Sequence, residues 1–161
     1  MAQIQVHGLS VYKKGFDMRA ITTNGIEVKI YKTKSYMRKA IRRIGYNCSK
    51  TEAMVIPCTV YAFENGKQVR KPIYGEMYIH ENAAMPILVH ETLHAATTVI
   101  RKTRNRSLNL GSGIRREEER LAYTQTAILQ DILKIFFPLK NSDHDLGDIE
   151  WWVNGSIKEN S

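Results

Sequence analysis

The chain is poor in cysteine and has no long apolar run. Cys48 and Cys58 are its only cysteines among 161 residues, too few for a disulfide framework or a four-cysteine zinc site. No stretch approaches the roughly 18 consecutive apolar residues of a membrane span. The N-terminal residues lack the basic and apolar regions of a secretory signal. We therefore expect a cytoplasmic protein with reduced thiols and no membrane segment.

The chain is also too short for two ordinary domains, and it has no internal repeat or low-complexity segment. Hydrophobic residues make up 43% of it and charged residues 25%, which is the composition of a globular protein. We expect one domain over residues 1–161. The sign of the charge reverses near the end, which defines an acidic C-terminal tail at about 141–161.

The positive charge is concentrated in two segments. The net charge is +8, and residues 29–50 contain eight Lys or Arg and no acidic residue, while residues 101–120 contain seven more. A basic surface of this kind attracts nucleic acid or an acidic protein. The alternative is a solvated helix face plus a basic loop. The candidate surface consists of Arg38, Lys39, Arg42, Arg43, Arg101, Lys102, Arg104 and Arg106.

A strand and a helix are predicted in the first third of the chain. Residues 26–31 alternate apolar and polar side chains, as a half-buried strand does. Ser35 can cap a helix that ends at Gly45. The apolar residues of this helix recur with helical spacing, at Met37, Ala40, Ile41 and Ile44.

A hairpin and two long helices are predicted after it. Residues 54–63 and 69–80 are rich in β-branched and aromatic residues, and they flank a turn signal at Asn65-Gly66. The first long helix is expected from an N-cap at Asn82 to about Arg101. The second should run over about 114–137, with Pro138 as its stop. The apolar stripe of the first is assigned to Met85, Val89, Leu93, Ala96 and Ile100.

This order of elements predicts an α+β domain with helices behind a small antiparallel or mixed sheet. Within its first long helix lies the motif HExxH, at His90, Glu91 and His94. Residues i and i+4 share one helix face, so both imidazoles can reach a single Zn²⁺ at about 2.0–2.1 Å. Glu91 is then placed to take a proton from a zinc-bound water. The alternative is two surface histidines on an amphipathic helix.

Two short motifs together carry a family resemblance. HExxHA at residues 90–95 and EExxAY at 118–123 resemble the HExxH…E zincins, gluzincin-like metallopeptidases. The likeness is to the small single-domain forms of bacteria, phages and mobile elements, to which the ImmA/IrrE-like peptidases are related. It covers about residues 74–133. It implies a minimal zincin fold in which the sheet packs on the active-site helix and a second long helix.

The resemblance also implies a set of zinc ligands and an activity. His90, His94 and Glu119 would hold one Zn²⁺ per chain and leave a fourth position for water, as in a catalytic site. Glu118 is the alternative third ligand, because neighbouring helix positions point about 100° apart. His144 is a further alternative. The expected function is hydrolysis of peptide bonds in a protein or peptide substrate.

The resemblance further suggests where a substrate would bind. Residues 75–80 precede the active-site helix, where zincins keep the edge strand that pairs with an extended peptide. Tyr123 and His80 are candidates for stabilising the oxyanion. The rival hypothesis is a weakly catalytic or non-catalytic zinc-binding protein of a phage or mobile element. Such a protein would act by binding nucleic acid or an acidic host protein through its basic surface.

Overall fold

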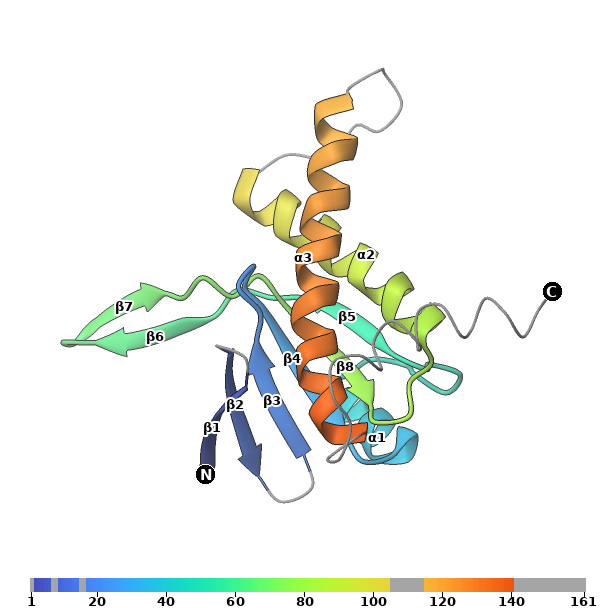
Figure 1. The fold of residues 1–161 in the computed structure, drawn as a ribbon. Helices are drawn as coiled ribbons and strands as arrows, with labels where there is room; N and C mark the ends of the chain where they lie inside the picture. The colour runs from blue at the N-terminus through green and yellow to red at the C-terminus, as the bar shows by residue number, and fades with distance from the viewer. Residues whose placement is uncertain (1, 7–8, 15–16, 105–114, 141–161) are drawn as a thin grey trace.

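The computed structural model describes residues 2–6, 9–14, 17–104 and 115–140. They form an α+β fold, as the order of predicted elements indicated, with a six-stranded sheet and three helices (Figure 1). The strand order in this sheet is β1-β2-β3-β4-β8-β5, and β6 and β7 form a separate two-stranded sheet. The predicted acidic tail lies outside the described residues.

The sheet begins with three strands that were not predicted. They are β1 (Ala2–Val6), β2 (Leu9–Lys14) and β3 (Asp17–Ile21), each antiparallel to the next. β3 pairs in turn with β4 (Ile26–Tyr31), the strand predicted at 26–31. The alternating pattern of β4 is confirmed, because its buried apolar side chains on one face are Ile26, Val28 and Ile30.

Helix α1 (Lys34–Arg43) follows β4 and has a different cap from the predicted one. Thr33, not Ser35, is the N-cap: its backbone is extended, and its side chain accepts a hydrogen bond from a first-turn backbone N–H. Ser35 already lies inside the helix. The predicted end at Gly45 is confirmed by a φ of 93°, and Ile44, the last of the apolar residues with helical spacing, is exposed.

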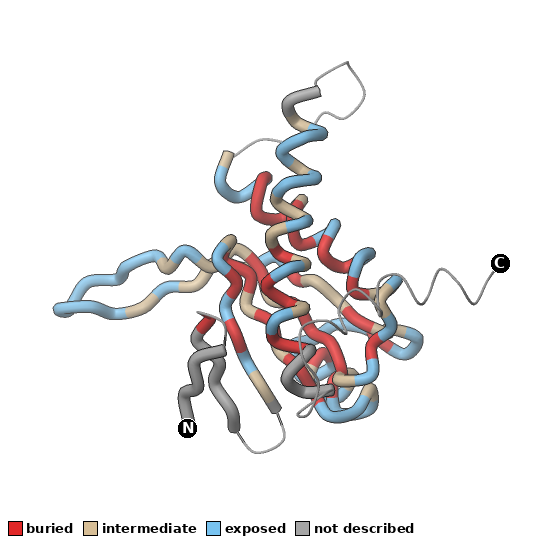
Figure 2. Tube along the Cα trace, in the orientation of Figure 1, coloured by how far each residue is buried: buried red, intermediate tan, exposed pale blue. Residues whose placement is uncertain are grey.

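The predicted hairpin is present, and its outer half projects from the body of the protein as an exposed arm (Figures 1 and 2). Asn65 and Gly66 form its turn with φ values of 50° and 75°, as the Asn-Gly signal predicted. The arm consists of β6 and β7, and the inner half joins the main sheet. The four strands are β5 (Met54–Pro57), β6 (Tyr61–Glu64), β7 (Lys67–Arg70) and β8 (Gly75–His80).

The prediction that residues 75–80 form an edge strand is wrong. β8 lies inside the sheet, parallel to β4 and antiparallel to β5. Its side chains are buried on both faces, with Met77 and Ile79 on one and Tyr78 and His80 on the other, so both faces are covered by other elements. The edge strand is β5, and its last residue, Pro57, suits an edge because it has no N–H to donate.

Both long helices extend beyond their predicted ends. α2 (Met85–Arg104) begins three residues after Asn82, which is therefore not its N-cap. α3 (Arg115–Lys140) continues past Pro138. A proline removes one backbone donor and crowds the preceding turn, which weakens a helix without necessarily ending it. No described helix qualifies as a membrane-crossing segment.

The buried face of α2 differs from the predicted stripe. Val89 and Leu93 are 38% and 39% exposed, because small residues take the inner positions instead. They allow the helix to lie close to the sheet: the methyl group of Thr98 would be only 3.2 Å from a Cβ at Gly75 of β8. The buried residues of α2 are Leu88, Glu91, Thr92, Ala95, Ala96, Thr98, Val99 and Ile100.

The sheet separates two cores. The larger core packs Val28 and Met77 against α2 and α3, and the smaller packs Tyr31 and Tyr78 against Met37 of α1. Because side chains alternate along a strand, these cores lie on opposite faces of the sheet. We call them the α2 face and the α1 face. This division decides which candidate residues can act together.

Candidate metal centre

His90 and His94 lie together on the exposed side of α2. Their Nε2 atoms are 3.1 Å apart, and the rings meet nearly edge to face, with centroids 4.7 Å apart and planes at 80°. Two nitrogens bound tetrahedrally to one zinc at about 2.0–2.1 Å would be about 3.3 Å apart. The pair therefore fits two positions of a zinc site, as the i and i+4 spacing predicted.

Glu91 lies on the buried side of α2, next to the edge strand and near both histidines. Its side chain is buried and accepts a hydrogen bond from the backbone N–H of Val55 in β5. Burial raises the pKa of Glu91, while the charges of His94 and His90 and the bond from Val55 act in the opposite direction. Nothing in the sequence indicated Val55, because its part in the site depends on the order of strands in the sheet.

The third ligand is not assembled with this pair. Glu118 and Glu119 are exposed on the first turns of α3, and Glu117 pairs with Arg104 of α2 at 3.4 Å. Among the residues that the structure describes, no three His, Cys, Asp or Glu side chains gather closely enough to hold a metal ion. The other alternative, His144, lies outside the described residues. The structure thus brings together two of the three expected ligands.

Two polar contacts that were not predicted from the sequence anchor α3, one to the turn between β3 and β4 and one to α2. Asp131 is 3% exposed and accepts hydrogen bonds from Thr23 N at 2.9 Å and Thr23 Oγ1 at 2.8 Å. Gln125 Nε2 donates to the carbonyl oxygen of Val89 at 3.1 Å. An acidic residue within an apolar stripe is the signal that could have identified Asp131. Its neighbours in that stripe are Ile128, Ile132 and Ile135.

In the part of the chain that the structure describes, neither candidate for the oxyanion contact is hydrogen-bonded to the histidine pair. Tyr123 is 76% exposed on α3. His80 is buried on the α1 face, and its Nε2 lies 3.7 Å from Glu52 Oε2 without a hydrogen-bond partner. Burial and the charge of Lys34 lower the pKa of His80. Because α2 packs on the opposite face, the structure does not place His80 with His90.

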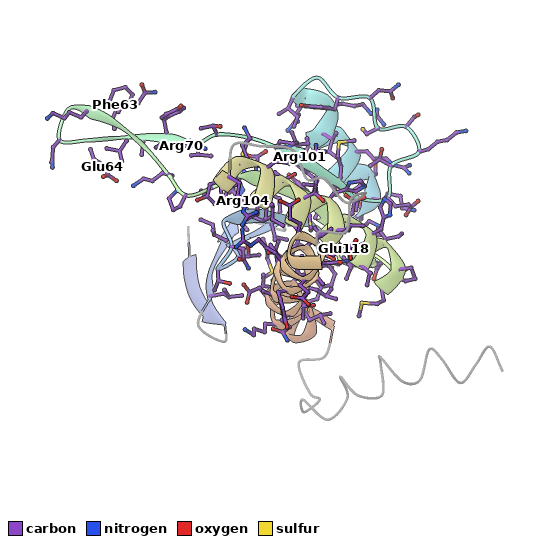
Figure 3. The ribbon with its side chains drawn as sticks, turned by 90° about the horizontal axis from the view of Figure 1, so that it is seen from above. Phe63, Glu64, Arg70, Arg101, Arg104 and Glu118 are labelled. Atoms are coloured by element: carbon purple, nitrogen blue, oxygen red, sulfur yellow. The ribbon has the colours of Figure 1, made fainter. Side chains whose placement is uncertain are left out.

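The candidate basic surface is divided by the fold. Lys39, Arg42 and Arg43 are exposed on α1, whereas Arg101 and Lys102 are exposed at the end of α2, which packs on the other face of the sheet. Figure 3 shows Arg101 and Arg104 on α2, with Arg70 and Phe63 farther out along the arm. The structure therefore offers two basic areas in place of one.

Some members of this surface are already engaged. Arg38 donates to the Thr51 carbonyl oxygen at 2.9 Å and lies 3.7 Å from Glu52. Arg104 is paired with Glu117, and Arg106 lies outside the described residues. The α1 area therefore consists mainly of Lys39, Arg42 and Arg43.

Comparisons with protein-family models, with curated proteins and with solved structures find no match to this chain. The arguments that follow therefore rest on the motif and on the geometry of its residues.

Proposed function

We propose that the protein is a zinc-dependent metallopeptidase, in which His90 and His94 bind the metal and Glu91 is the general base. The observation that carries this proposal is the geometry of the HExxH segment. Two imidazole nitrogens converge at 3.1 Å on the exposed side of the helix, and the intervening glutamate is held against the edge strand. Two surface histidines alone would not explain why a glutamate of the same motif, Glu91, is buried.

Zn²⁺ bound by these histidines would supply a Lewis acid that polarises a peptide carbonyl and acidifies water. The protein's own groups have separate tasks. His90 and His94 would hold the metal through Nε2. The carboxylate of Glu91 accepts the proton of the attacking water and later delivers it to the leaving amine. The hydrogen bond from Val55 N–H restrains this carboxylate while it does so.

The edge of β5 is the proposed place for the substrate. β5 pairs with β8 on one side only, and the side away from β8 ends the sheet. An extended peptide could pair there, in the manner of an added strand, by donating its own N–H groups to carbonyl oxygens of β5, since the Val55 N–H is bonded to Glu91 and Pro57 has no N–H. Val55 lies on this strand, so a peptide paired with β5 would pass beside Glu91. This proposal transfers the substrate position from β8 to β5.

Zinc analysis of the purified protein tests the metal site. We expect about one zinc per chain, because a catalytic site has three protein ligands and one open position. The double variant His90→Ala/His94→Ala should lose it, and His7→Ala, a histidine outside the motif, is the matched control. Retention of zinc by the double variant would show that the metal binds elsewhere.

The third ligand requires its own comparison. Glu119→Gln should weaken zinc affinity by more than about 100-fold, since loss of a mere outer-shell contact already costs about 10–100-fold. Glu118→Gln and His144→Ala should leave the affinity nearly unchanged. A competitive titration with a zinc-binding dye measures all three. The reverse ranking would assign the third ligand to Glu118 or His144.

Glu91→Gln separates catalysis from binding. This variant keeps the shape of the side chain and should retain zinc, yet lose about 10²–10⁴-fold in rate with the removal of the general base. The substrate for the assay is a protein that the inactive variant retains and the wild type cleaves. If Glu91→Gln cleaves it as fast as the wild type does, Glu91 is not the base.

A further inference from the structure

A pocket of about 450 Å³ lies on the α1 face of the sheet, opposite the face on which α2 packs. Its volume falls within the range of small-molecule sites, about 300–1,000 Å³. The floor is a row of side chains across three strands, since Arg19 of β3 is paired with Lys29 of β4, which is paired with Tyr78 of β8. The sheet register thus fixes the floor of the pocket.

Helix α1 supplies the wall. Tyr36, Lys39, Ala40 and Arg43 occupy positions i, i+3, i+4 and i+7, and all four line the pocket. The apolar stripe of α1 contains Met37 and Ile41. These two side chains are buried against the sheet and fix the helix in place. The wall is therefore one face of an anchored helix.

Every charged residue that lines the pocket is basic. Lys29 is already neutralised, because its Nζ lies 2.7 Å from Glu76 Oε1. Arg19, Lys39 and Arg43 form no salt bridge with any residue that the structure describes. Arg19 also acts on Glu76, whose pKa its charge helps to lower, so Lys39 and Arg43 are the stronger candidates for binding an anion with more than one charge, such as a phosphate group.

Aromatic surface lies beside these cations. Tyr36 is 58% exposed, although it stands on a helix whose inner face is fully packed. Tyr31 and Tyr78 also line the pocket but are buried. Their ring centroids are 6.2 Å apart and their planes are within 7° of parallel, and Lys29 Nζ lies 5.0 Å from the Tyr78 ring centre. An exposed aromatic ring beside cations is the usual means of holding a nucleobase and its backbone, and Tyr36 is the ring here that could stack on a base.

We infer that this pocket binds a nucleotide unit, with its phosphate near Arg19, Lys39 and Arg43 and its base against Tyr36. The unit is either a free nucleotide or one residue of a single-stranded nucleic acid. An acidic peptide would satisfy the cations but would leave Tyr36 without a partner. This inference goes beyond the proposed peptidase function and does not depend on it, because the pocket and the histidine pair lie on opposite faces of the sheet.

Fluorescence anisotropy with a labelled oligothymidylate tests the inference. We expect the single strand to bind at moderate salt. Displacement by ATP at a similar concentration of nucleotide units would identify a free nucleotide as a sufficient ligand. Binding of the strand with no displacement by ATP would identify single-stranded nucleic acid as the source. Absence of binding by both would overturn the inference.

Matched variants separate the pocket from general attraction between charges. Arg43→Glu should weaken binding at least tenfold more than Arg42→Glu, which makes the same change of charge one residue away, outside the lining. Tyr36→Ala should weaken it about tenfold, as loss of one stacked base does, while Tyr36→Phe should bind normally. Equal losses in Arg42→Glu and Arg43→Glu would refute the inference.

Two further results would refute it in different ways. Displacement of the oligonucleotide by polyglutamate as effectively as by unlabelled strand would identify an acidic peptide as the ligand. Tighter binding of a duplex, unaffected by Tyr36→Ala, would exclude stacking of a base. The variant His90→Ala/His94→Ala should bind the oligonucleotide normally, and Arg43→Glu should retain its zinc, so failure of one proposal is distinguishable from failure of the other.

Discussion

The turn between β3 and β4 is packed so closely that one added methyl group should destabilise the protein. Gly25 has a φ of 79°, and its carbonyl oxygen accepts a hydrogen bond from Tyr74 N at 2.8 Å. A Cβ at this position would collide with the carbonyl oxygen of Pro72 and lie 2.9 Å from the Tyr74 ring. This contact holds the turn against the segment that joins the arm to β8.

The loss of stability expected for Gly25→Ala has two parts. A left-handed backbone costs an alanine about 1–2 kcal/mol relative to glycine. Relief of the collision requires the backbone to move, and such overpacking costs about 1–3 kcal/mol more. The expected decrease in the free energy of unfolding is therefore about 2–5 kcal/mol. Gly66 provides a matched control, because its φ is 75° and nothing lies within 4 Å of its Cβ position.

Urea unfolding followed by circular dichroism measures both variants. Gly66→Ala should lose only the backbone contribution, about 1–2 kcal/mol. The difference between the two variants is then the cost of the collision with Pro72 and Tyr74. Equal losses in Gly25→Ala and Gly66→Ala would refute the reasoning, because they would mean that the turn does not lie against this segment.

Two further predictions concern buried polar contacts. Asp131→Ala should lose about 1.5–3 kcal/mol of stability for each hydrogen bond from Thr23. Thr23→Val should lose less stability, because the hydrogen bond from its backbone N–H remains. Equal losses of the two variants in urea unfolding would contradict this prediction. Burial raises the pKa of Glu76, but hydrogen bonds from Lys29 and Tyr78 outweigh it and hold the pKa below 4.5. The stability that this carboxylate supplies is present above pH 4.5 and is lost as the pH falls through its lower folded value. Glu76→Gln should flatten the decline of stability below pH 4.5, and an unchanged acid profile would argue against the contact.

The elements that the sequence predicted correctly are those whose signals are local. Asn65-Gly66 determines a turn through backbone conformations that few other residue pairs adopt. Gly45 ends α1 for the same kind of reason. The histidines of HExxH meet because a helix places residues i and i+4 together, whatever lies around it. None of these inferences needs knowledge of a distant part of the chain.

The errors have a common cause in long-range packing. Whether residues 75–80 lie at the edge or inside the sheet depends on β4 and β5, which are distant in sequence. Of the stripe predicted for α2, Ala96 and Ile100 are buried but Val89 and Leu93 are exposed, and the close approach of Thr98 to Gly75 of β8 shows that a distant strand determines which side of the helix faces inward. The position of Glu119 likewise depends on how α3 is anchored by Asp131, a contact with a residue 108 positions earlier.

β8 is the element that the two proposed sites share, and this determines how one could influence the other. Tyr78 forms part of the pocket floor, while its neighbours Met77 and Ile79 belong to the core beneath α2. A ligand in the pocket is therefore separated from the histidine-bearing helix by a single strand. Any effect of a nucleotide on zinc affinity would have to pass through this strand. If a nucleotide changed the zinc affinity by some factor, zinc would change the nucleotide affinity by the same factor. Since Met77 and Ile79 are fully buried and Lys29 holds Tyr78 from the pocket side, displacement of β8 would strain both cores at once. The geometry thus favours two sites that bind independently.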